Sequence, residues 1–226
     1  MVIMNLLFFI LFALLLFLSI FLGGKKFRTS ALYALAIGSC VNANFFNAQK
    51  FPIDIFNHTF GIDSILFTLF IFCVIVLIFE QGKKQAYILG FSSIIAIMLC
   101  AVFDVVARSL SEGYKSSNWI IFNDFLISSL VSVFVVVITI ELVCFLRTKS
   151  IIKNDYLLLI IGLINAVLVN SPWYYLGEAL AHQQKIDILE PLITSWIGEI
   201  ISCGCGVLTL LLLKLYDSRN TKKDRS

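Results

Sequence analysis

The 226-residue sequence is poor in charged residues, and this shortage excludes an ordinary soluble domain. Charged residues make up 14% of the chain, whereas soluble domains usually carry about 25%. Hydrophobic residues make up 60%, and a water-soluble fold of this length could not hide that much apolar surface in one core. The composition therefore favours a protein embedded in a lipid bilayer.

The sequence also lacks the alternating ten-residue segments that are typical of a transmembrane β-barrel. Its hydrophobic residues stand instead in long continuous runs. Inside a bilayer only helices and closed barrels satisfy every backbone polar group. The long runs therefore predict an all-α, polytopic transmembrane helical bundle.

Motifs that commonly carry catalysis or bind metals are absent as well. The two histidines, His58 and His182, fall in predicted outer loops, so we expect no histidine base inside the membrane. No H-E-x-x-H, G-x-S-x-G or phosphate-binding glycine loop occurs, and the six cysteines form no C-x-x-C pair. We therefore predict that the chain is not an enzyme and holds no cofactor or metal.

What the sequence does contain is seven apolar segments, each long enough to cross a bilayer as a helix. They cover residues 1–22, 29–49, 63–80, 86–108, 119–145, 156–178 and 191–216, with a predicted loop over 51–62. Positive charge follows the first segment instead of preceding it, which indicates a retained span rather than a signal peptide. We expect an N-terminal transmembrane helix (1–24), a six-span core (25–216) and a charged cytoplasmic tail (217–226).

Lysine and arginine are divided unevenly between the two sides of these segments. If the first span starts outside, four of the 17 basic residues, Lys50, Arg108, Lys115 and Lys185, lie on the outer side. The other 13 lie in or beside the inner connections and the C-terminal tail. By the positive-inside rule, we predict a multi-pass protein of the cell membrane with its N-terminus outside and its C-terminus in the cytoplasm.

Polar residues of several segments lie at similar depths in the outer half of the membrane. Ionisable groups inside spans cost free energy and are therefore candidates for function. At about 1.5 Å of rise per residue, Glu199 lies ~12 Å and Asp124 ~8 Å below the outer ends of their spans. We predict a cavity that opens outward between segment two and segments four to seven, with the first segment peripheral. The predicted substrate-binding residues are Asn44, Asp104, Asp124, Asn170, Trp173, Glu178, Trp196 and Glu199.

Glu199 is the first candidate among these residues. Ser195, Glu199, Ser202 and Gly206 are spaced four, three and four apart, which places them on one face of a helix. No basic residue lies within one turn of Glu199. A carboxylate there must be protonated, paired with another helix, or reserved for a ligand or a coupling proton.

Each candidate also has a structural interpretation, which stays open at this point. Asp104 and Arg108 lie four residues apart and can pair on one helix face. Asp124 and Glu178 lie close enough to the interface to be solvated. Stripes of serine and asparagine also stabilise contacts between transmembrane helices.

Two short stretches resemble the vitamin-uptake or queuosine-precursor transporter family. The first is Ala43-Asn44, followed six residues later by Lys50. The second is the turn E-Q-G-K-K-Q-A over residues 80–86, followed by G-F at 90–91. The resemblance covers residues 31–215. It implies a transporter that takes up a deazapurine or a vitamin-like solute.

The residues themselves favour a small polar solute that is neutral or cationic. Desolvating a cation beside Asp104, Asp124 and Glu199 costs less than desolvating an anion there, and Trp173 and Trp196 could stack on a planar ring. The leading prediction is an integral-membrane transporter whose partners are the lipid bilayer and this solute, with no role for nucleic acid. One alternative is the substrate-binding component of an energy-coupling transporter, which needs separate ATPase and coupling subunits. Another is a membrane assembly subunit that transports nothing.

Overall fold

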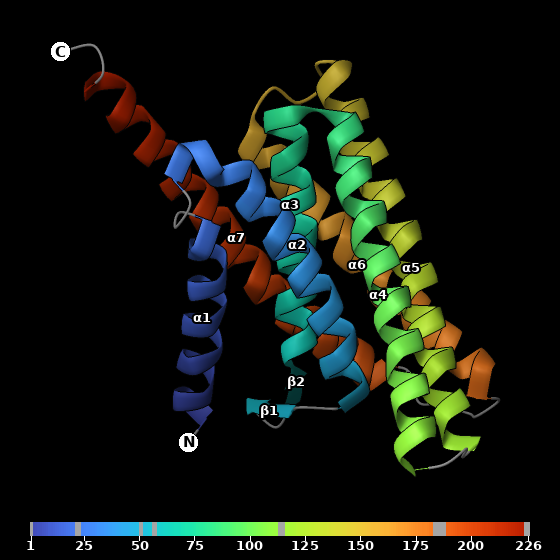
Figure 1. Ribbon diagram of the computed structural model, residues 1–226. Helices are drawn as coiled ribbons and strands as arrows, with labels where there is room; N and C mark the ends of the chain where they lie inside the picture. The colour runs from blue at the N-terminus through green and yellow to red at the C-terminus, as the bar shows by residue number, and fades with distance from the viewer. Residues whose placement is uncertain are drawn as a thin grey trace.

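The computed structural model describes residues 2–20, 24–49, 52–55, 58–112, 116–182 and 189–223, which form seven helices and one short hairpin (Figure 1). The helices are α1 (Val2–Leu18), α2 (Gly24–Gln49), α3 (Ile62–Gln81), α4 (Lys83–Glu112), α5 (Ser116–Thr148), α6 (Asp155–His182) and α7 (Leu189–Lys223). The prediction of an all-α, polytopic helical bundle is confirmed.

Within the described part of the chain, five helices are long and apolar enough to cross a membrane. They are α3 to α7, over Ile62–Gln81, Lys83–Ser111, Phe122–Thr148, Asp155–Gly177 and Leu192–Tyr216. The 17 residues of α1 reach only ~26 Å, slightly less than the hydrocarbon core. The sequence of α2 is more polar, because it begins G-K-K-F-R and carries three asparagines near its end.

The two ends of the chain lie at opposite ends of the bundle (Figure 1). An odd number of membrane crossings requires this arrangement, and both the five candidate spans and the full set of seven described helices are odd in number. The clusters of basic residues at 83–84 and 147–149 belong to the end that carries the C-terminus. The assignment of that end to the cytoplasm stays a prediction from the charge distribution.

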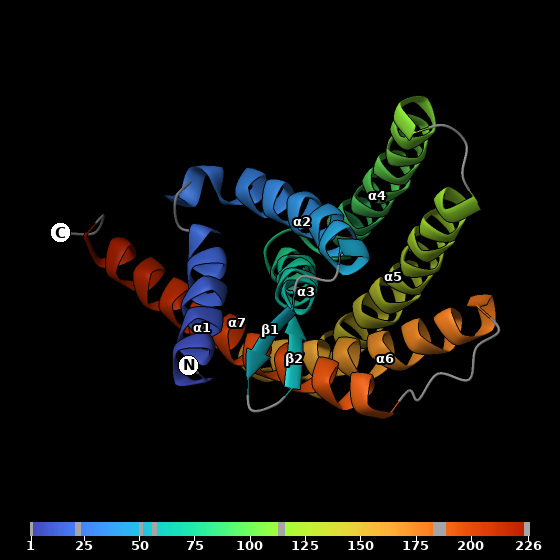
Figure 2. The ribbon, with the colours of Figure 1, turned by 90° about the horizontal axis from the view of Figure 1, so that it is seen from below.

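Helix α3 forms the centre of the bundle. Every residue from Ser64 to Ile78 is buried, and α3 contacts each of the other six helices. Figure 2 shows it enclosed by its neighbours. No charged residue stands between Asp63 and Glu80, so α3 has no charged face. A helix of this kind can be surrounded by other helices at the centre of the bundle.

Small residues allow the neighbouring helices to approach α3 closely. A Cβ atom at Gly162 of α6 would lie 2.7 Å from Ile75 Cδ1 of α3 and 2.9 Å from Val143 Cγ2 of α5. One turn earlier on α3, Phe72 meets Phe17 of α1 edge to face, with 5.1 Å between ring centroids. Close approach of backbones is the usual basis of helix association in membranes.

The turn between α3 and α4 depends on Gly82. Its φ of 88° lies in the left-handed region, which glycine adopts at little cost. Its N–H donates to the carbonyl oxygens of Leu77 and Ile78, both at 3.2 Å. These bonds satisfy carbonyl groups left open at the end of α3, as is common for a glycine after a helix.

The segment predicted as a loop over 51–62 contains a small hairpin, which corrects that prediction. Strands β1 (Pro52–Ile55) and β2 (His58–Gly61) pair antiparallel, with Pro52 opposite Gly61 and Ile55 opposite His58. Strand β1 contacts α1, and β2 contacts α3 and α7. The alternation Ile53-Asp54-Ile55 is the pattern of a short strand with one apolar face.

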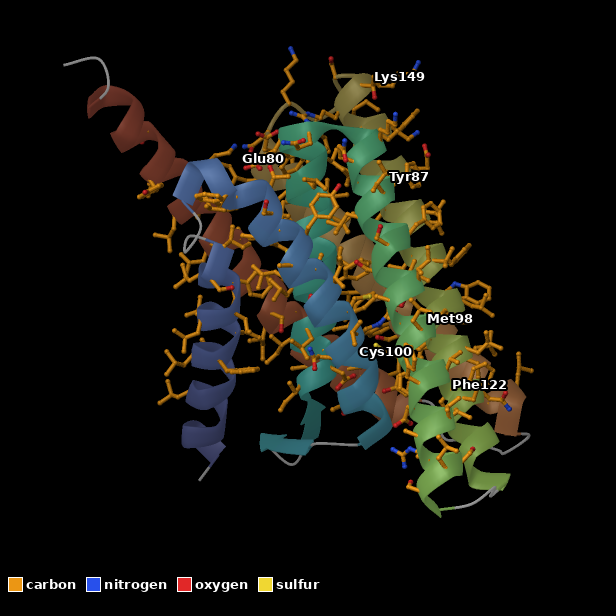
Figure 3. The ribbon with its side chains drawn as sticks, in the orientation of Figure 1. Glu80, Tyr87, Met98, Cys100, Phe122 and Lys149 are labelled. Atoms are coloured by element: carbon orange, nitrogen blue, oxygen red, sulfur yellow. The ribbon has the colours of Figure 1, made fainter. Side chains whose placement is uncertain are left out.

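Ion pairs link the helices at the end of the bundle where α3 terminates. Arg28 of α2 pairs with Glu80 of α3 at 3.2 Å. Two further pairs join other helices, Lys83–Glu141 at 2.7 Å between α4 and α5 and Lys214–Asp155 at 3.0 Å between α7 and α6. Glu80 and Lys149 mark this end in Figure 3. Each pair joins two helices, so the three pairs link α2 to α3, α4 to α5 and α6 to α7 at the basic end of the molecule.

Candidate functional site

A polar pocket lies between five helices, in the half of the bundle away from the ion pairs. It has a volume of about 50 Å³, enough for a few water molecules or one small ion. Its lining comes from α2 (Ala43), α3 (Asp63, Ser64, Phe67), α5 (Ser128, Ser132), α6 (Asn170, Ser171, Tyr174, Tyr175) and α7 (Ser195, Glu199). Two carboxyl groups, one amide and several hydroxyl groups therefore meet in one small cavity.

Glu199 is the most buried acid of this pocket, with an exposed fraction of 2%. Its carboxyl group accepts hydrogen bonds from Asn170 Nδ2 at 3.4 Å, from Ser171 Oγ at 3.3 Å to each oxygen, and from Ser195 Oγ at 3.4 Å. These distances lie beyond the usual 2.7–3.2 Å, so the donors hold Glu199 loosely. A shorter bond to a bound ligand could replace any of them.

In the described part of the chain, the electrostatic surroundings of Glu199 are acidic. Among the ion pairs formed by the described residues, none includes Glu199. The charged group that acts on it is Asp63, a second acid in the same pocket. Asp63 stands in the first turn of α3, where backbone N–H groups have no partner within the helix.

The pocket is thus rich in acceptors, which suits a proton or a cation better than an anion. It is not a typical metal centre. No group of three or more histidine, cysteine or acidic side chains that could hold a metal ion occurs in the described part of the chain. Asp63, Glu199 and the hydroxyl groups could still surround a hydrated cation or a protonated amine.

Pro172 lies inside α6, next to the residues that line the pocket. Proline has no N–H and disturbs the carbonyl one turn before it. Asn170 on this turn faces α7, whereas Asn165 donates from Nδ2 to Thr139 Oγ1 of α5 at 3.4 Å. The two asparagines therefore face different helices, as their spacing of five residues requires.

Of the predicted binding residues, Asn170 and Glu199 come together in the pocket. Asp104 does not line it, because its Oδ2 accepts a bond from Arg108 Nε at 2.8 Å on the same face of α4. Trp173 is 49% exposed and packs its ring edge to face against Phe134. Both lie on sides of the helices that face away from the pocket lining.

The other predicted residues fall into two groups. Asp124 is partly buried one turn before Ser128 and does not line the pocket, and Trp196 packs against the hydrophobic core. The indole N–H of Trp196 is buried without a hydrogen-bond partner among the described residues. Asn44 and Glu178 belong to α2 and α6, but their side chains lie outside the described residues.

The expectation that segment four would line the cavity is wrong. Helix α4 contributes no residue to it, and α3 contributes Asp63, Ser64 and Phe67 instead. Figure 2 shows the near end of α4 turned away from α3. Sequence reasoning missed Asp63 because it stands at the first turn of its span, where an acid usually meets water. The signal available was an acid at the start of a segment that is otherwise wholly apolar.

Comparison with known proteins adds no relative. The chain matches no protein-family model, no curated protein and no solved structure. The resemblance to the vitamin-uptake or queuosine-precursor transporter family accordingly stays a prediction. The arguments for a function come from the bundle and from the pocket around Glu199.

Proposed function

We propose that this integral-membrane protein is a transporter that binds a small cationic or neutral solute in the pocket around Glu199. The observation that carries the proposal is a glutamate of 2% exposure that is surrounded by neutral donors and a second acid inside a membrane bundle. Groups of this kind mark ion, proton or substrate sites in membrane proteins.

A purely structural role of Glu199, in stabilising the contact between helices, explains the pocket less well. An acidic side chain at the centre of a membrane costs about 3 kcal/mol on insertion scales. Serine, threonine and asparagine hold helices together at a lower cost, and this chain uses them for that purpose at Asn165 and Thr139. A carboxyl group next to Asp63 is better explained by a site that binds and releases a cation or a proton.

The lining also limits the class of solute. Hydroxyl groups of Tyr174, Tyr175, Ser128 and Ser132 offer both donors and acceptors, and the two carboxyl groups favour an amine or an amidine. A cavity of about 50 Å³ is smaller than a deazapurine, so a solute of that size would require α6 and α7 to separate. Alternating access by movement of one helix group against another supplies such an opening.

The test is uptake by the protein alone in proteoliposomes. A panel of small amines, amidines and neutral polar solutes is offered with and without an inward proton gradient, and the vesicle contents are quantified by mass spectrometry. Glu199→Gln keeps the size of the side chain and its hydrogen bonds, and we expect it to lower uptake at least tenfold. Asp104→Asn removes an acid that is paired with Arg108 outside the pocket, and we expect uptake to persist.

Three other outcomes have a clear meaning. Binding of a solute without accumulation is expected of the alternative in which separate ATPase subunits drive transport, and those subunits should then copurify with the chain. Normal uptake by Glu199→Gln in a correctly inserted protein would move the site away from this pocket. If the protein neither binds nor takes up any solute of the panel, the alternative of an assembly subunit is favoured.

A further inference from the structure

A second hollow lies far from the pocket, on the outer face of α4. It is a groove of about 600 Å³ that is lined by Lys83, Lys84, Tyr87, Ile88, Phe91 and Ile95, together with one serine. Tyr87 lies on α4 toward the end of the bundle that also carries Lys149 (Figure 3). The groove therefore begins at the basic end of the molecule and runs along the side of the bundle.

The mouth of the groove carries an excess of positive charge. Lys83 lies 2.7 Å from a carboxylate oxygen of Glu141, and Tyr87 donates its hydroxyl hydrogen to the same carboxylate. Lys84 is exposed and takes part in none of the ion pairs formed by the described residues. Lys83 is thus paired with Glu141, whereas the positive charge of Lys84 has no ion-pair partner among the described residues.

The wall of the groove is apolar and faces outward. Tyr87 and Phe91 stack with 5.9 Å between ring centroids and 13° between ring planes. Ile88, Phe91 and Ile95 are 44%, 43% and 60% exposed, as expected for the lipid-facing side of a helix that is apolar enough to span the membrane. An exposed apolar strip of this kind requires a nonpolar partner.

The length of the groove corresponds to one leaflet of the bilayer. Lys84 and Ile95 are separated by 11 residues of helix, or ~16 Å. The hydrocarbon core of a bilayer is ~30 Å thick, so the strip covers about half of it. A molecule that fills the groove needs an anionic group at one end and apolar chains about 15 Å long at the other.

We propose that this groove binds one anionic phospholipid from the leaflet at the basic end of the molecule. The phosphate group lies at Lys84, and the acyl chains lie against Ile88, Phe91 and Ile95. Basic pockets beside transmembrane helices bind anionic head groups in this way. A zwitterionic lipid is disfavoured, because its own cationic group would stand near the uncompensated charge of Lys84.

The experiment uses the full chain, purified in detergent and mixed with equal amounts of dioleoylphosphatidylglycerol and dioleoylphosphatidylcholine. Native mass spectrometry then counts the lipids that each protein molecule retains. We expect one phosphatidylglycerol to be retained at least fivefold more often than phosphatidylcholine. Lys84→Gln should remove most of this preference, whereas Lys149→Gln, an exposed lysine at the same end but outside the groove, should keep it.

A second pair of variants tests the apolar wall. Phe91→Ala should lower total lipid retention more than Phe145→Ala, because Phe145 is 54% exposed on α5 but does not line the groove. All four side chains are exposed or half-exposed, and a monodisperse elution profile checks that each variant is folded. Equal retention of the two lipids by the wild type, or an equal loss of preference in Lys84→Gln and Lys149→Gln, would overturn the proposal.

Discussion

At the scale of single residues, the pocket depends on neutral donors that hold an acid without neutralising it. Ser171 has the central place among them. Its hydroxyl lies 3.3 Å from both oxygens of Glu199 and 3.0 Å from Ser195 Oγ. Among the donors to Glu199, Ser171 is the one that lies within reach of both carboxyl oxygens and of the neighbouring donor Ser195.

Ser171→Ala should consequently weaken binding without abolishing it. One hydrogen bond to a charged or polar acceptor contributes about 1 kcal/mol, so we expect the apparent affinity for a transported solute to fall about fivefold. Initial rates of uptake over a range of solute concentrations measure this change. Ser93→Ala is the matched control, since Ser93 is equally buried but donates only to Leu89 of its own helix. Identical affinities for the two variants would contradict the assigned role of Ser171.

At the scale of the elements, the observed helices agree closely with the predicted segments. The segments do not predict which helix packs against which. The segment predicted at 63–80 became α3 over Ile62–Gln81, with nearly the same bounds. Nothing in its apolar sequence distinguished a central helix from one that faces lipid on one side. The contacts of α3 with all six other helices decided that question.

Close packing against α3 predicts a contrast between two glycines. At Gly162 a new side chain would strike Ile75 and Val143, whereas a Cβ atom at Gly204 would meet nothing within 4 Å. Gly162→Val should lower the free energy of unfolding by about 1–3 kcal/mol through overpacking. Gly204→Val makes the same change in the open and should have little effect. Thermal unfolding in detergent, followed by circular dichroism, compares the two, and equal midpoints would contradict the packing of α6 on α3.

At the scale of the whole molecule, opposite ends of the bundle have different characters. The end with the C-terminus holds three interhelical ion pairs and most of the basic residues. The other half holds the pocket with its two acids. If the positive-inside rule holds for this chain, the pocket lies in the outer half of the membrane and the ion pairs lie in the inner half.

This polarity predicts the result of fusing reporters to the chain. A fluorescent protein attached after Ser226 should mature and fluoresce, because the positive-inside rule places that end in the cytoplasm. An alkaline phosphatase inserted after Glu112, at the opposite end of α4, should be active outside. A non-fluorescent fusion at Ser226 together with an inactive phosphatase at Glu112, both in correctly inserted protein, would reverse the predicted orientation of the chain.

The sequence by itself determined the membrane class, the bounds of the helices and the asymmetry of charge, because these depend on local hydropathy and on counts of residues. It also identified Glu199 and Asn170 as polar groups at the same depth. Only the tertiary structure decided that they meet, 29 residues apart in the chain, at 3.4 Å, and that Asp63 joins them while Asp104 pairs with Arg108. The physical reason is that lipid and protein interior are both apolar. Hydropathy therefore predicts where a helix crosses the membrane but not which of its faces meets another helix.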